Sequence, residues 1–136
     1  MYLRLGLGSA FLSAVADRFG LWGPRGAPLV AWGNFHRFLL YVAKINPWFP
    51  HRWIPGVGWI ATVCEIVFGI ALILGIRTRV AAFLSGLLLL AFAGGMTAGL
   101  GIKSPLDYSV FTASAAAFLL ATIRYFPLSL DAHFQK

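Results

Sequence analysis

Four long apolar stretches, separated by short breaks containing glycine, proline or charged residues, dominate the sequence. They run from about residue 2 to 19, 57 to 76, 78 to 101 and 105 to 126. Each is close to the ~20 apolar residues that an α-helix needs to cross a bilayer. The pattern therefore predicts an all-α integral membrane protein, a four-helix bundle formed by one domain over residues 1–136.

A different pattern occupies the segment between the first and second stretches. From about residue 29 to 45, polar and basic residues recur on one side of a helix, at about 100° per residue. Apolar and aromatic residues fill the remainder. This predicts an amphipathic helix that lies in the membrane interface, or alternatively a lid packed across the mouth of the bundle. All five tryptophans lie between residues 20 and 59, which indicates an aromatic belt at that interface.

Local signals indicate where the later helices begin and end. Thr78 is a candidate N-cap for the third span. Ser104, Pro105 and Asp107 resemble a capping box at the start of the fourth, and Pro127 is expected to end it.

Small residues recur at a spacing of four in three of the spans. Such stripes let membrane helices approach closely, either within a bundle or across a dimer interface. The stripes are Gly6, Ala10 and Ala14; Gly95 and Gly99; and Ala113, Ala117 and Ala121.

Composition supports a membrane protein and excludes several other classes. Hydrophobic residues make up 60% of the chain and charged residues 11%, against about 25% in typical soluble domains. The net charge of +7 comes from basic residues that flank the apolar spans, which suits anionic lipid headgroups. No basic run with interleaved aromatic residues is present, so we expect the lipid bilayer as a partner and no nucleic acid.

Cysteine and histidine offer little chemistry. Cys64 is the one cysteine, so the chain cannot form an intramolecular disulfide, and we interpret it as a small buried apolar residue. The three histidines lack the spacing of metal ligands, so no metal site is predicted.

Glu65 is the most informative candidate for function, because it lies inside the apolar second span. A carboxylate at that depth costs roughly 2.5–3.5 kcal/mol on insertion scales, so it usually faces a bundle interior or a cavity. Two interpretations stay open. Glu65 binds a polar ligand, relays protons or hydrogen-bonds a quinone, or it hydrogen-bonds a neighbouring helix and locks the bundle.

Other polar residues can be placed near Glu65 by depth, at about 1.5 Å per residue along a helix. If their faces converge, they complete a ligand-binding core around an intramembrane cavity. The candidates for this core are Ser13, Thr97, Tyr108 and Thr112. The candidates for the mouth of the cavity are Asp17, Arg18, Lys103 and Asp107.

The segment from Glu65 through Gly69 and Gly75 to Arg77-Thr78-Arg79 resembles the DoxX family of small four-helix membrane proteins. Residues 104–108 and 129–131 are similar to that family's fourth helix and tail. The resemblance implies four spans in a prokaryotic cytoplasmic membrane, with both termini cytoplasmic. Of the residues in the family's motif, only Glu65 and the turn of residues 77–79 are carried over.

Some members of that family are linked to thiosulfate:quinone oxidoreductase as its small membrane subunit. The resemblance therefore implies a membrane subunit of a redox system, with a quinone as cofactor and a redox subunit or a second copy as partner. Such a subunit need not be catalytic itself. The alternative is a non-enzymatic scaffold, or a bundle that binds a small molecule or cargo. A transporter is the weakest interpretation, because no broken helix or inverted repeat is evident.

Charge alone does not settle the orientation. Four spans place both termini and the turn at Arg77 and Arg79 on one side, and basic residues are similarly frequent on the other. We expect the termini and this turn to be cytoplasmic because the turn is short.

Overall fold

The computed structural model describes residues 1–124, 126 and 128–134, and this part of the chain is helical without strands. The prediction of an all-α protein is therefore confirmed. The helices are α1 (Tyr2–Arg18), α2 (Phe35–Ile45), the short 3-10 helix η1 (His51–Trp53), α3 (Ile54–Leu74), α4 (Thr78–Leu100), α5 (Lys103–Asp107), α6 (Val110–Thr122) and α7 (Leu130–Phe134).

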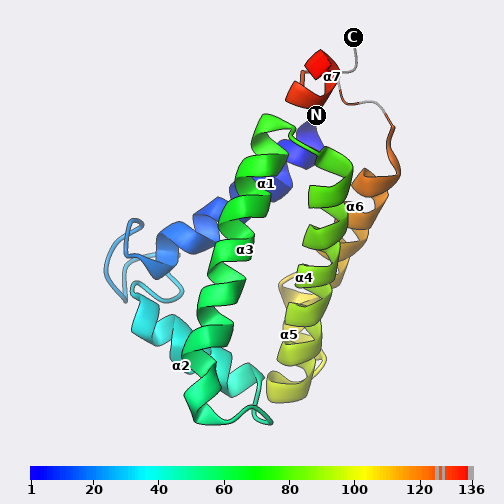
Figure 1. Ribbon diagram of the computed structural model, residues 1–136. Helices are drawn as coiled ribbons and strands as arrows, with labels where there is room; N and C mark the ends of the chain where they lie inside the picture. The colour runs from blue at the N-terminus through cyan, green and yellow to red at the C-terminus, as the bar shows by residue number, and fades with distance from the viewer. Residues whose placement is uncertain (125, 127, 135–136) are drawn as a thin grey trace.

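Two pairs of helices form the body of the molecule, with α1 beside α3 and α4 beside α6 (Figure 1). The helices α2 and α5 lie at one end, whereas α7 and the start of α1 lie at the other (Figure 1). Leu72, Ala82 and Ala117 are fully buried where α3, α4 and α6 meet. The core thus consists mainly of small and aliphatic side chains.

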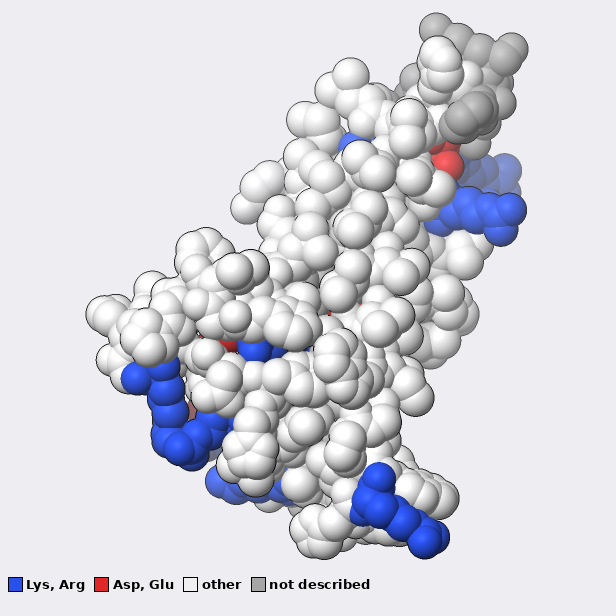
Figure 2. Space-filling model, turned by 60° about the vertical axis from the view of Figure 1, so that its left-hand side comes forward, with Lys and Arg blue, Asp and Glu red and all other residues white. Residues whose placement is uncertain are grey.

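Two helical segments are long and apolar enough to cross a membrane, the continuous run His51–Leu74 and the helix Thr78–Leu100. The outward face of α3 exposes large apolar residues such as Ile60, Val63 and Val67. Most of the Lys and Arg atoms lie toward the two ends of the face seen in Figure 2, and the band between them is mostly uncharged, with a few blue and red atoms visible in a gap between white ones. A continuous apolar surface of this kind marks contact with lipid or protein.

The predicted fourth span is not one continuous helix. Ser109 takes a left-handed conformation with φ of 55°, and this separates α5 from α6. The predicted capping box is also wrong, because Ser104 lies inside α5 and Asp107 pairs with Lys103 at the surface. The helix ends at Thr122 rather than near residue 126, and Pro127 lies outside the described residues.

The third span begins where predicted, but Thr78 does not cap it. Arg77 occupies the N-cap position with φ of 43°. The backbone N–H groups of Arg77 and Thr78 each donate to a carboxylate oxygen of Asp131, at 2.7 Å. The cap therefore comes from a residue more than 50 positions later, which a local sequence pattern cannot reveal.

The predicted amphipathic helix starts later than expected, at Phe35 rather than near residue 29. Asn34 caps it, because its side-chain oxygen accepts a hydrogen bond from the Arg37 N–H at 2.9 Å. The helix buries one face against the bundle through Phe38, Val42 and Ile45. α2 thus packs on α3 and α4, and its position relative to a membrane stays a prediction.

Glycines allow the helices to approach closely, though not all at the predicted positions. A Cβ built on Gly99 of α4 would lie 2.3 Å from the Lys44 carbonyl oxygen. The end of α2 therefore packs closely on α4 at Gly95 and Gly99. On α1 the close contact is at Gly8, whose added Cβ would lie 2.8 Å from the Gly69 carbonyl oxygen of α3. The stripe that begins at Gly6 does not form this contact, since Gly6 has open space around it.

Candidate functional site: the buried Arg18–Glu65 ion pair

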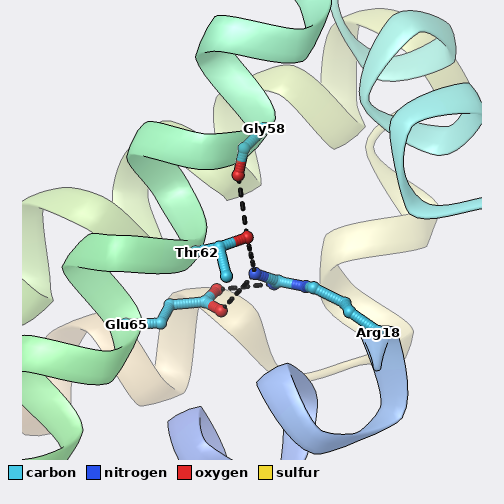
Figure 3. A network of polar contacts seen from close by, with 4 residues as sticks. All are labelled: Arg18, Gly58, Thr62 and Glu65. Carbon is cyan, nitrogen blue, oxygen red and sulfur yellow. Dashed lines mark hydrogen bonds and ion pairs between the residues drawn. The ribbon is translucent and has the colours of Figure 1, made fainter. Parts of the chain in front are cut away.

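Glu65 forms a buried ion pair with Arg18, the last residue of α1 (Figure 3). Arg18 Nη1 lies 2.6 Å from Glu65 Oε2, and Arg18 Nη2 donates to Glu65 Oε1 at 2.9 Å. Both side chains are only 2% exposed. The Nη2 contact is a charge-assisted hydrogen bond, whereas the Nη1 contact is an ion-pair contact in which Oε2 accepts no hydrogen bond.

A third polar residue extends the pair along α3. Arg18 Nη1 donates to Thr62 Oγ1 at 2.9 Å, and that hydroxyl donates to the Gly58 carbonyl oxygen at 2.8 Å (Figure 3). Gly58, Thr62 and Glu65 follow each other at intervals of four and three, so they share one face of the helix. This face is turned toward the end of α1.

Aromatic residues cover the guanidinium group. The Arg18 Cζ atom lies 3.8 Å from the centroid of the Phe38 ring and 5.4 Å from that of Trp32. A cation over an aromatic face is attracted by the ring quadrupole, more strongly where water is excluded. Because Phe38 belongs to α2, this contact also holds α2 against the end of α1.

The neighbouring Asp17 holds the loop that leads to α2. Its carboxylate accepts hydrogen bonds from the backbone N–H groups of Ala31, Trp32 and Gly33, at 2.7–3.2 Å. Gly33 has φ of +70°, and a Cβ there would lie 2.6 Å from the backbone nitrogen of Arg25, so a larger residue does not fit without a shift of the loop. Two consecutive charged residues at the end of α1 therefore fix the helix α3, the loop and α2 relative to one another.

The electrostatics explain why these charges occur in so apolar a chain. Placing Glu65 in the core alone would leave an uncompensated charge, whereas the Arg18 guanidinium neutralises it and donates a hydrogen bond to Oε1. The geometry matches the interpretation in which Glu65 locks helices together. Its role in ligand binding stays a prediction.

The other predicted site residues lie away from this pair. Thr97 donates to the Ala93 carbonyl oxygen of its own helix, and Ser13, Tyr108 and Thr112 are exposed. Of the predicted mouth residues, Asp17 and Arg18 join the buried site, whereas Lys103 and Asp107 pair with each other at the surface. The turn formed by Arg77, Thr78 and Arg79 lies at the opposite end of α3.

Sequence reasoning missed Thr62 and Phe38. Thr62 could have been found, because it lies three residues before Glu65 on the same helical face. Phe38 carried no such signal, since its role depends on how α2 folds back. The structure has open pockets of about 350 Å³ and about 530 Å³, and Glu65 lines neither of them.

Comparison with known families gives one match. The family described as "Methylamine utilisation protein MauE" matches residues 1–107 of the 136. The chain belongs to the MauE family. The match covers α1 to α5, and therefore both Arg18 and Glu65, and it ends at the last residue of α5. No curated protein and no solved structure matches the chain.

This match corrects the resemblance to the DoxX family, which is wrong. The family found is MauE, a different family of membrane proteins, and DoxX does not match. The residues that suggested DoxX have general physical roles. The Glu65 carboxylate is paired with Arg18, and the turn after α3 uses left-handed backbone at Gly75 and Arg77.

Proposed function

We propose that this MauE family member is a non-catalytic membrane component of a redox system that serves methylamine utilisation. The family match over residues 1–107 supports the biological setting. The buried Arg18–Glu65 pair is the main support for a non-catalytic role, because the Glu65 carboxylate is already used to hold α1 against α3. On this proposal, the chain acts by binding a partner redox subunit.

The proposed architecture is one domain with four membrane crossings, formed by α1, α3, α4 and the broken helix α5–α6. At ~1.5 Å per residue, the 17 residues of α1 span roughly 26 Å and the 21 residues of α3 roughly 32 Å. Both lengths are near the ~30 Å thickness of the hydrocarbon core. We place the protein in a prokaryotic cytoplasmic membrane with both termini on the cytoplasmic side.

We assign α2 and the exposed tryptophans that follow it as the surface that binds the partner. Trp48 and Trp53 are more than half exposed beside the end of α2, and Trp59 is nearly so. Exposed tryptophans suit either the membrane interface or a protein interface, since they combine a large apolar ring with one N–H donor. The Arg18–Glu65 pair would hold this surface in place.

Gene replacement in a bacterium that grows on methylamine and carries this chain tests the proposal. Deletion should abolish growth on methylamine and leave growth on succinate unchanged. Glu65→Gln should lower the amount of protein in the membrane and methylamine growth in parallel. Lys103→Gln, which breaks only the exposed pair, should change neither. Normal growth on methylamine after deletion would refute the proposed function.

The same strains also test the quinone alternative. Lipids extracted from purified wild type and from Glu65→Gln would be analysed for quinone. On our proposal, the quinone content per protein is the same in both. A quinone held by wild type and lost from a Glu65→Gln protein of normal abundance would instead make Glu65 a ligand-binding residue.

A further inference from the structure

A second polar site lies at the opposite end of the molecule, beside the turn between α3 and α4. It is an open pocket of about 350 Å³. Its walls come from that turn, from the start of α4 and from the segment after α6. The lining residues are Arg77, Thr78, Arg79, Val80, Arg124, Phe126 and Asp131.

The charges around this pocket are unbalanced. Three arginines, Arg77, Arg79 and Arg124, line it together with a single carboxylate, that of Asp131. Both oxygens of that carboxylate accept backbone N–H groups at the start of α4. The ion pairs within the described part of the chain are Arg18–Glu65 and Lys103–Asp107, so none of the three pocket arginines takes part in one.

Thr78 lines the pocket together with the arginines but is completely buried. Its side chain lies close enough to the Asp131 carboxylate to help hold the pKa of that group below its ordinary value. The three arginine side chains, which are exposed, are therefore the groups open to a ligand. The Arg79 side chain is held against the last turn of α6, because its Nε donates to the Ala121 carbonyl oxygen at 3.2 Å.

The pocket also lies at the right level for a lipid headgroup. It begins where α3 ends, and α3 is one of the helices apolar and long enough to cross a membrane. Blue and red atoms gather together at this end of the molecule, beyond the mostly uncharged band (Figure 2). Basic pockets between helices at a membrane surface bind phosphate-bearing headgroups through charge-assisted hydrogen bonds.

We propose that this pocket binds a phosphate group, with Arg77, Arg79 and Arg124 as its cationic ligands. The source of the phosphate is an anionic phospholipid headgroup or free phosphate. The site is independent of the role in methylamine utilisation.

Native mass spectrometry of the full-length protein tests this inference. Wild type would be released from nanodiscs that contain phosphatidylglycerol and phosphatidylcholine in equal amounts. The test variant is Arg77→Gln/Arg124→Gln. The matched control is Arg52→Gln, which removes an exposed arginine at the opposite end of α3. We expect wild type and the control to retain phosphatidylglycerol in preference, and the double variant to bind it about 25-fold more weakly, at about fivefold per arginine.

Added inorganic phosphate separates the two sources. If phosphate at millimolar concentration displaces the lipid from wild type, the site recognises the phosphate group itself. If the lipid stays bound, the headgroup with its attached chains is the ligand. Arg77→Lys/Arg124→Lys keeps the charge and should retain most of the lipid, which shows that the loss in the glutamine variant is not misfolding. Equal retention of phosphatidylglycerol by the double glutamine variant and by Arg52→Gln would overturn the proposal.

Discussion

At the scale of single residues, the Arg18–Glu65 pair is the most sensitive point of the fold, because either charge would destabilise the folded protein if it were buried without the other. Arg18→Met leaves the Glu65 carboxylate buried and unpaired, and should lower the free energy of unfolding by about 3–5 kcal/mol. Arg18→Met combined with Glu65→Leu should recover much of this loss. Unfolding in detergent by SDS titration measures all three proteins. A double variant as unstable as the single one would show that the two residues do not act as a pair.

Asp17 acts on the loop rather than on α3. Asp17→Ala removes the acceptor of the N–H groups of Ala31, Trp32 and Gly33, so these amides should exchange hydrogen at least tenfold faster. Hydrogen exchange followed by mass spectrometry resolves this segment. Asp107→Asn, which alters an exposed carboxylate far from the loop, is the matched control. Unchanged exchange at residues 31–33 would contradict the role that we give to Asp17.

At this scale, the sequence could predict where a residue lies within its own helix, but not which residue of another helix it contacts. The depth of Glu65 followed from the apolar run, and the rule that a buried carboxylate faces the protein interior held. Its partner did not follow, because Arg18 was expected at the cavity mouth and reaches Glu65 only as α1 packs on α3. The polar core expected around Ser13 and Thr112 stays a prediction; both residues are exposed in the structure, since the rotation of a helix about its axis, as well as depth, decides which side chains converge.

At the scale of elements, the contact between α4 and α2 depends on a missing side chain. Gly99→Ala would place a Cβ 2.3 Å from the Lys44 carbonyl oxygen and 2.6 Å from Ile45 Cα, so α2 must move away. We expect a loss of about 1–3 kcal/mol in the free energy of unfolding. Gly94→Ala on the same helix meets nothing within 4 Å and should stabilise by about 1 kcal/mol through helix propensity. If both variants behave alike, the close approach is not what Gly99 provides.

The cap that Asp131 places on α4 should make this end of the molecule sensitive to acid. Partial burial raises the pKa of Asp131, but hydrogen bonds from the backbone N–H and the side chain of Thr78 and from the backbone N–H of Arg77, with the Arg4 charge, outweigh it and hold the pKa below its ordinary value. Because the pKa of Asp131 is lower in the folded state, its ionised carboxylate stabilises the folded protein at pH values above the unfolded pKa of about 3.9. This stabilisation is lost as the pH falls through the folded-state pKa.

Measurement of stability against pH checks this. Wild type should lose stability below about pH 4 more steeply than Asp131→Asn, whose amide does not titrate in this range. The variant should be less stable at neutral pH, where it lacks the charge. Identical slopes below pH 4 would show that the carboxylate does not contribute through its ionisation. Sequence could not foresee this cap, because capping signals are read within a few residues and Asp131 comes from the far end of the chain.

At the scale of the whole molecule, hydrophobic period and length predicted three of the helices well. The ranges expected for α1, α3 and α4 agree with the structure within three residues. The fourth failed at Ser109, because a left-handed residue there leaves no mark on the apolar pattern. The family assignment to DoxX was also wrong, since it rested on a short motif, whereas the MauE match extends over residues 1–107.

The fold makes a definite prediction about membrane topology. Arg4 Nη2 donates to the Leu128 carbonyl oxygen at 2.7 Å, so the start of α1 and the segment before α7 lie at the same end. With four crossings, single cysteines at Tyr2 and at Lys103, in a Cys64→Ala background, should react with a membrane-impermeant maleimide from opposite sides. Tyr2 is 90% exposed and Lys103 83%, so either thiol is accessible. Labelling of both from one side of sealed vesicles would mean that the bundle does not cross the membrane as we propose.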